Sequence, residues 1–177
     1  ILNYQARICG INIKNNLNIN LINVYCPNGN PLENKEKFDF KIRWLDELIV
    51  VIKNLIKERK NVILAGDFNV LDDTRDVQDF ENWRNDALGN HISRQKFREL
   101  LFSGLTNIVR LYHKPGKKYS FWDYQKSSWE RNYGLLIDHF LVSPGISQIT
   151  ETIQFEKEFR SKIKPSDHIP LWIKITT

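Results

Sequence analysis

The sequence predicts a layered α/β domain, and three features of the chain indicate it. A chain of 177 residues is the size of one domain and can bury a sizeable core. A long amphipathic pattern leads directly into Val62 to Ala65, an uncharged apolar run that is typical of a buried strand. Further short apolar runs show the two-residue period of strands. A helix whose apolar stripe packs on neighbouring strands produces a layered α/β architecture.

The first two strands are predicted over residues 7–13 and 17–25, where apolar residues alternate for part of each run. The residues between them, Lys-Asn-Asn at 14–16, form a hairpin-like connector, so the two strands are expected to be antiparallel. Pro27 then removes a backbone donor and Gly29 permits a positive φ. The sheet is therefore expected to break there.

Two helices are predicted from the three- and four-residue spacing of their apolar side chains. The longer one covers residues 33–60, and the shorter one covers residues 94–103 with Ser93 as its N-cap and Gly104 at its end. The inward side chains of the longer helix are expected to be Trp44, Leu45, Leu48, Ile52, Leu55 and Ile56.

The remaining segments are expected to be one long polar connection and two more strands. Residues 71–90 are predicted to cross the surface, with solvated acidic side chains rather than a metal site. Residues 135–143 form an apolar run that Asp138 interrupts, and residues 171–175 alternate in the manner of a final strand.

The composition is that of a soluble globular protein, with 41% apolar and 27% charged residues. No apolar run approaches the length of a membrane span, so no membrane partner is expected. The net charge of +5 favours a polyanionic partner. Cys9 and Cys26 have neither the spacing nor the histidines of a metal or redox site, and both are expected to be buried and reduced in a cytoplasmic protein.

Asp67 and Asn69 follow the buried strand, and Gly66 lets the backbone turn before them. Residues two apart in an extended segment point to one face, so the carboxylate and the amide are expected to lie side by side at the carboxyl edge of the sheet. Such a pair is suited to orienting a water against a phosphate. The alternative is a turn that only ends the strand.

Two more polar interruptions occur at strand ends or inside strands. Asp138 lies in an apolar run and needs a partner, because an unpaired buried carboxylate is costly. Asp167 and His168 come just before the final strand. A histidine held by a buried carboxylate, with a second carboxylate nearby to place water or a metal, fits hydrolysis of a phosphate ester. The alternatives are that Asp167 caps a turn and that His168 fills a polar niche.

Five motifs of the chain, in this order, resemble one enzyme family: Asn23 to Gly29, Gly66 to Asn69, Ser120 to Tyr124, Leu136 to Asp138 and Ser166 to Pro170. They resemble the exonuclease III type of apurinic/apyrimidinic endonuclease within the endonuclease/exonuclease/phosphatase superfamily. The likeness covers nearly the whole chain. It implies a layered α/β sandwich of the DNase I-like type.

The resemblance also implies roles for the polar residues. Asp67 would orient or deprotonate the attacking water, and Asn69 would hold that water or a phosphate oxygen. His168 would contact the scissile phosphate and stabilise its developing charge, with Asp138 fixing the orientation and tautomer of the ring. Tyr25 would donate a hydrogen bond to the phosphate, and Asn28 would line the floor of the same site. Asp167 would contribute to a Mg²⁺ or Mn²⁺ site.

For Phe121 and Trp122 the resemblance implies the walls of a pocket that takes an extrahelical sugar lacking its base. The alternative is that both rings belong to the core. The implied substrate is double-stranded DNA with abasic sites or 3′ ends. The implied reactions are hydrolysis on the 5′ side of an abasic site, 3′ to 5′ exonuclease action and 3′-phosphatase action, by an enzyme that is a monomer when intact.

The chain departs from the family pattern in two places. Leu136 stands where the family usually has a basic residue. The chain also has no Gln-Glu pair, whose glutamate is the main metal ligand of the family, and it contains no Met. We therefore expect residues 1–177 to be a single, amino-terminally truncated domain that lacks the opening strands, has an uncovered sheet edge or face, and shows little nuclease activity by itself. The missing segment is then a possible partner.

Two other functions remain open at the level of the sequence. One is another phosphoesterase of the same superfamily, such as an enzyme acting on inositol phosphates or lipids. The other is a non-catalytic remnant or a module that binds DNA or a partner protein.

Overall fold

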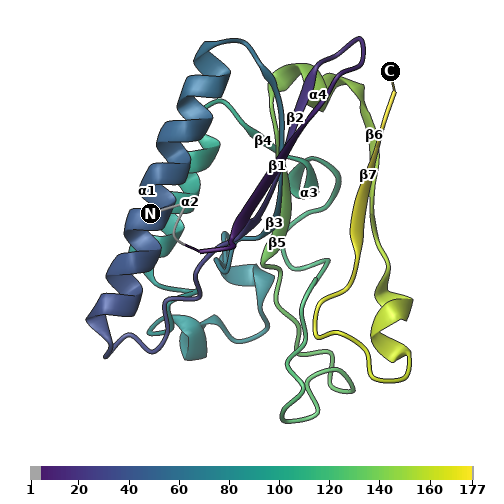
Figure 1. The fold of residues 1–177 in the computed structure, drawn as a ribbon. Coiled ribbons are helices and arrows are strands. Elements are labelled where there is room, and N and C mark those ends of the chain that lie inside the picture. Colours follow the sequence, from purple (N-terminus) through teal and green to yellow (C-terminus); the bar gives the residue numbers. More distant parts are fainter. Residues whose placement is uncertain (1–4, 177) are drawn as a thin grey trace.

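A computed structural model describes residues 5–176 as three layers (Figure 1). Two helices cover one face of a five-stranded sheet, and a two-stranded sheet lies on the other side (Figure 1). The helices are α1 (Lys35–Lys57), α2 (His91–Leu101), α3 (Ile108–Tyr112) and α4 (Pro144–Ile149). The strands are β1 (Ile8–Ile13), β2 (Ile19–Tyr25), β3 (Asn61–Asp67), β4 (Thr106–Asn107), β5 (Asp138–Val142), β6 (Thr150–Phe155) and β7 (Leu171–Ile175). The layered α/β prediction is confirmed.

The larger sheet has the strand order β1-β2-β3-β5-β4. The predicted antiparallel hairpin is confirmed, because β1 pairs with β2 from Ile8 opposite Val24 to Ile13 opposite Ile19. β2 and β3 are parallel and are joined through α1, as a parallel crossover requires. β3 and β5 are antiparallel. The smaller sheet is the antiparallel pair β6-β7.

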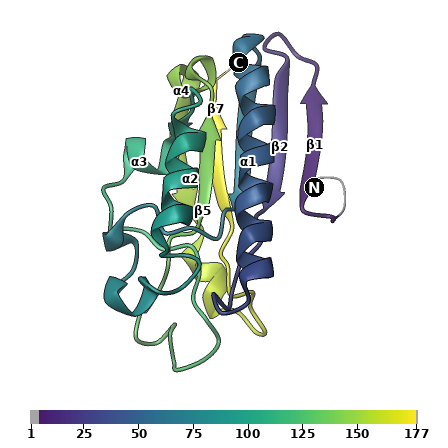
Figure 2. The ribbon, with the colours of Figure 1, turned by 90° about the vertical axis from the view of Figure 1, so that its left-hand side faces the viewer.

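α1 forms because its apolar side chains recur on one face and its first turn is capped. The side chain of Asn34 accepts a hydrogen bond from the backbone N–H of Lys37. The helix is two or three residues shorter at each end than predicted. Five apolar side chains of its buried face lie in the main core, together with residues of β2, β3 and α2: Trp44, Leu45, Leu48, Ile49 and Ile52. Figure 2 shows α1 and α2 side by side over the sheet.

A second core cluster lies between the other face of the large sheet and the β6-β7 pair. It contains Ile63 of β3, Val142 of β5 and Ile153 of β6, with Ile173 of β7 packed against it. The apolar alternation predicted for residues 171–175 is explained by this contact, because β7 turns one face inward. Within residues 5–176, no helix is long and apolar enough to cross a membrane.

The start of the second helix was predicted wrongly. α2 begins at His91, and its N-cap is Asn90, whose side chain accepts from the N–H of Ile92. Ser93 lies inside the first turn and is buried. The fifth strand is also shorter than the predicted 135–143, because only Asp138–Val142 is regular strand. Leu135 instead forms a bridge with Phe121.

The connection over residues 71–90 is not only a surface segment. The side chain of Asp76 is fully buried and pairs with Arg110, which also reaches Asp72 at 3.3 Å. This partly buried guanidinium, which belongs to α3, compensates carboxylates that the sequence predicted to be solvated. The sequence did not predict α3. Leu71 and Leu88 lie in a third apolar cluster.

The two cysteines also differ from the prediction that both are buried. Cys26 is buried, but Cys9 is exposed, because it lies on β1 at the edge of the large sheet. Burial raises the pKa of the Cys26 thiol to about 12, despite the opposing charge of Lys41. Cys26 is therefore an uncharged part of the core.

Candidate active site

The site begins at the carboxyl end of β3, where Asp67 is the last strand residue. Gly66 has φ +134°, and a Cβ there would lie 2.0 Å from the carbonyl oxygen of Val24, so only glycine fits. Asn69 has a left-handed φ of 49°. Its backbone N–H and its Nδ2 donate to the two carboxylate oxygens of Asp67 at 2.8 and 3.0 Å. The two side chains therefore lie together, as the sequence predicted.

The second part of the site is a histidine–carboxylate pair. Nδ1 of His168 lies 2.8 Å from Oδ2 of Asp138, and both side chains are partly buried. Asp138 begins β5 and stands opposite Asp67 in the β3–β5 register. Ser120, which is fully buried, accepts the backbone N–H groups of Ile137 and Asp138 on its Oγ at 3.2 Å each. Asp67, Asp138 and His168 thus meet at one edge of the sheet.

The electrostatics of this group follow from its partial burial. Burial and the charge of Asp138 raise the pKa of Asp67 to about 7, although His168, the Asn69 hydrogen bond and Lys41 oppose the rise. Burial lowers the pKa of His168, but the hydrogen bond and charge of Asp138 outweigh it and bring that pKa to about 9. Near neutral pH, His168 is therefore protonated, and Asp67 is present in both its protonated and its charged form.

Lys41 of α1 joins the segments around this site, a role that the sequence did not predict. Its side chain is fully buried, and Nζ donates to the carbonyl oxygens of Asn28, Asn69 and Ala87 at 3.0, 2.6 and 3.1 Å. Burial lowers its pKa to about 8. The sequence does contain a sign that Lys41 is buried, because it lies three residues before Trp44 on the apolar stripe of α1.

Tyr25 and Asn28 lie at the same edge. Tyr25 ends β2 opposite Asp67, and its ring is 53% exposed under the guanidinium of Arg7. Asn28 donates from Nδ2 to Oδ1 of Asn69 at 3.3 Å. Both residues therefore border the carboxylate group, where the sequence predicted them.

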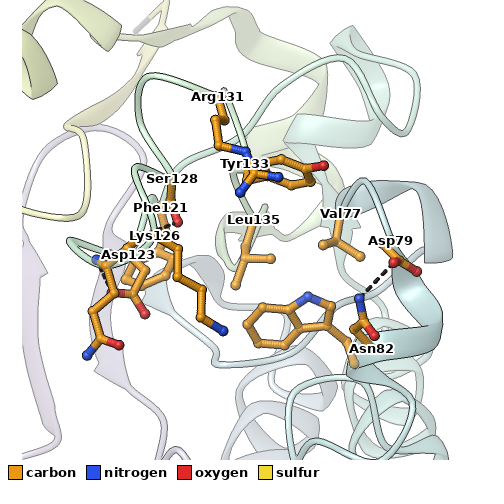
Figure 3. A pocket seen from close by; sticks show the side chains of 12 residues that line it. Val77, Asp79, Asn82, Phe121, Asp123, Lys126, Ser128, Arg131, Tyr133 and Leu135 are labelled. Atoms are coloured by element: carbon orange, nitrogen blue, oxygen red, sulfur yellow. Dashed lines mark hydrogen bonds between the residues drawn. The ribbon is translucent and has the colours of Figure 1, made fainter.

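Phe121 and Trp122 point to different places. The ring of Phe121 packs edge-on against His168 at a centroid distance of 5.0 Å and lines a cavity of about 390 Å³ (Figure 3). Trp122 is 1% exposed and packs between Tyr119 and Trp129. Its ring does not line that cavity, because the backbone alternates between these neighbouring positions.

The cavity beside Phe121 has residues that the sequence did not single out. In Figure 3, Leu135 lies between Val77 and Tyr133 on one side and Phe121 and Lys126 on the other. The apolar side chains form its wall and the polar ones its rim. The full lining is Val77, Asp79, Asn82, Trp83, Phe121, Asp123, Gln125, Lys126, Ser128, Arg131, Tyr133 and Leu135.

Asp167 lies next to His168, and its negative charge contributes to the raised pKa of that ring. Its carbonyl oxygen accepts the backbone N–H of Trp122. Across residues 5–176, no three acidic, histidine or cysteine side chains are grouped so that they could hold a metal ion. Leu136 is buried in the second core cluster.

The comparisons with known proteins agree with this geometry. Residues 6–168 match the model of the Endonuclease/Exonuclease/phosphatase family. An exodeoxyribonuclease of Bacillus subtilis is 30% identical over 155 residues, which are 87% of this chain and 59% of that protein. Among solved structures, the 3′ phosphatase NExo from Neisseria, bound to a product DNA hairpin, has a TM-score of 0.91 and 31% identity over 99% of this chain and 66% of that one.

An AP endonuclease from Archaeoglobus fulgidus has a TM-score of 0.89 and 27% identity, over 97% of this chain and 65% of that one. The chain thus spans about two thirds or less of these relatives. The protein belongs to the endonuclease/exonuclease/phosphatase family, and its fold is DNase I-like. Within that family it is of the exonuclease III type.

The His168–Asp138 pair gives a first prediction. In Asp138→Asn the pKa of His168 should fall from about 9 toward or below the ordinary value of about 6.5, because only burial and more distant charges then act on it. A pH titration followed by NMR of the imidazole signals measures this. An unaltered titration of His168 would show that the pair does not form.

The Lys41 contacts give a second prediction. Lys41→Met should lower the free energy of unfolding by about 2–3 kcal/mol, because buried carbonyl oxygens lose their donor. Urea denaturation measures the change. Lys53→Met, on an exposed position of the same helix, is the control and should stay within about 0.5 kcal/mol of the parent. Equal stabilities of the two variants would contradict the role of Lys41.

Proposed function

We propose that this chain forms most of the active site of a DNA repair phosphoesterase that hydrolyses duplex DNA at abasic sites and 3′ ends. The observation that carries the proposal is the meeting of the Asp67–Asn69 pair and the Asp138–His168 pair at one sheet edge. The names of the relatives, an exodeoxyribonuclease, a 3′ phosphatase and an AP endonuclease, support the choice of DNA as substrate. The net charge of +5 suits a polyanion.

In this proposal Asp67 accepts the proton of the attacking water. Its pKa near 7 is suitable for a general base, because the carboxylate is available at neutral pH and still basic enough to take a proton. Asn69 holds both carboxylate oxygens, and its own Nδ2 is fixed by the carbonyl of Cys26 at 2.9 Å. The water would then be oriented by a carboxylate that cannot rotate freely.

His168 stabilises the phosphate as negative charge develops. Asp138 occupies Nδ1 and keeps the ring protonated, so Nε2–H can donate to a phosphate oxygen. The exposed hydroxyl of Tyr25 and the amide of Asn28 border the same space and can donate from the other side. In this scheme no donor has to move when the phosphate binds.

The cavity beside Phe121 is the proposed place for the sugar that lacks its base. Phe121 contacts the ring of His168, so the cavity adjoins the phosphate position. Its apolar wall of Phe121, Leu135 and Trp83 suits a deoxyribose turned out of the duplex. Trp122 supports Phe121 from the core, rather than lining the cavity, in this proposal.

The family resemblance implies Mg²⁺ or Mn²⁺. The oxygens of Asp67, Asn69 and Asp167 are of the kind such ions prefer and would hold the ion. The steps above use only protein groups. A second candidate function is a DNA-binding module without catalysis, because the chain spans only about two thirds or less of the relatives whose names give an activity.

Salt-dependent binding tests the choice of substrate. We expect a DNA hairpin with an abasic site to bind more tightly than an intact one, and both affinities to fall about a hundredfold between about 50 and 200 mM salt, since phosphate contacts release counterions. Fluorescence anisotropy measures this. An affinity for DNA that does not change with salt concentration would contradict the proposal. Tighter binding to vesicles containing a phosphoinositide would favour the other phosphoesterases of the superfamily.

Cleavage under single-turnover conditions tests catalysis. With protein in excess over abasic hairpin, His168→Ala should reduce the rate constant by about 10²–10³-fold, because a positioned donor to the phosphate is lost. His91→Ala is the control and should leave the rate unchanged. If the parent protein binds abasic DNA but yields no product with Mg²⁺ present, catalysis by this chain alone is excluded and the DNA-binding candidate is favoured.

A further inference from the structure

The segment 159–166 presents an apolar side chain beside the active site without covering it. Ile163 is 95% exposed, which is the largest value among the exposed large apolar residues. Lys162 and Lys164 flank it, and Phe159, itself 42% exposed, lies under the ammonium of Lys162 at 3.9 Å. The segment therefore presents an exposed apolar side chain between two positive charges.

This segment is held at both ends. The guanidinium of Arg160, 7% exposed, donates to the carbonyl of Trp122 at 3.2 Å and lies over the ring of Tyr124. The hydroxyl of Tyr124 donates to the carbonyl of Pro165 at 2.8 Å. Ile163 is therefore carried by an anchored loop, so a ligand would meet it in a fixed place.

The hollow next to this segment borders the active site at His168. A hollow of about 460 Å³ is lined by Ile163, Lys162, Lys164 and Phe159, and also by His168. No carboxylate lines it. The cavity proposed for the sugar is lined by Phe121, whose ring contacts His168. The two hollows are thus neighbours, because a lining residue of one contacts a lining residue of the other.

We propose that the hollow at residues 159–166 binds the duplex beyond the scissile phosphate, with Ile163 against sugars and base edges of the groove and Lys162 and Lys164 on the phosphates. The inference rests on the proposed function, because it is DNA bound at His168 that would extend across this hollow. Apolar side chains flanked by cations make this kind of groove contact in other DNA-binding proteins. The two lysines in the lining suit a polyanion as the occupant.

The experiment compares variants of the whole chain in anisotropy titrations with a DNA hairpin. Ile163→Ala should weaken binding about fivefold or more with an unchanged salt slope, because an apolar contact is lost. The double variant Lys162→Ala, Lys164→Ala should weaken binding and lower the salt slope by about two. Phe102→Ala, an 87% exposed apolar residue after α2, is the control and should bind like the parent.

The outcomes separate this inference from the proposed function. If the parent binds DNA with a steep salt slope but Ile163→Ala binds equally well, or the lysine variant keeps the slope, the inference is wrong and the proposed function stands. If the parent does not bind DNA, or Ile163 is needed for binding to anionic lipid vesicles instead, both are overturned. Because Ile163 and Phe102 are exposed, equal melting temperatures are expected and exclude an effect of unfolding.

Discussion

The register of three neighbouring strands is the constraint on which the site depends. Tyr25 of β2 stands opposite Asp67 of β3, and Asp67 stands opposite Asp138 of β5, so three polar residues form one row across the sheet. A shift of one residue in either pairing would turn one of these side chains to the opposite face. Gly66 protects the register, because any larger residue would collide with the carbonyl of Val24.

The close approach of two carboxylates in this row explains the other polar groups around it. Asp67 and Asp138 repel one another, and each needs a compensating donor. Asn69 donates two N–H groups to Asp67, and Nδ1 of His168 forms a hydrogen bond with Asp138. Lys41 adds a buried positive charge and joins three loop carbonyls below. The result is a site whose polar side chains are held in position by hydrogen bonds within the protein.

Phe121 and Trp122, next to this row, have different contacts. Phe121 faces the cavity and the ring of His168, while Trp122 anchors the loop through Trp129 and the carbonyl bound by Arg160. The same Arg160 restrains the segment that carries Ile163. Arg160 therefore connects the loop of Phe121 and Trp122 with the segment that carries Ile163. A substitution in the core at Trp122 should therefore shift the segment that carries Ile163.

The sequence by itself determined the local elements and their order, because these follow from the spacing of apolar residues. The long helix, the buried strand before Asp67 and the first hairpin were predicted with errors of a few residues at their ends. The polar groups at strand ends were also predictable, since Asp67, Asp138 and His168 interrupt or bound apolar runs. Their roles in chemistry remain predictions.

Only the tertiary structure decided which buried polar groups find partners. Lys41 on an apolar stripe, Asp76 against Arg110, and Asn90 instead of Ser93 as a cap depend on residues far away or on the path of the chain. The exposure of Cys9 depends on the position of β1 at a sheet edge. Apolar burial has no direction and leaves a periodic trace in the sequence, whereas a hydrogen bond needs one donor and one acceptor whose meeting is fixed only when the chain is folded.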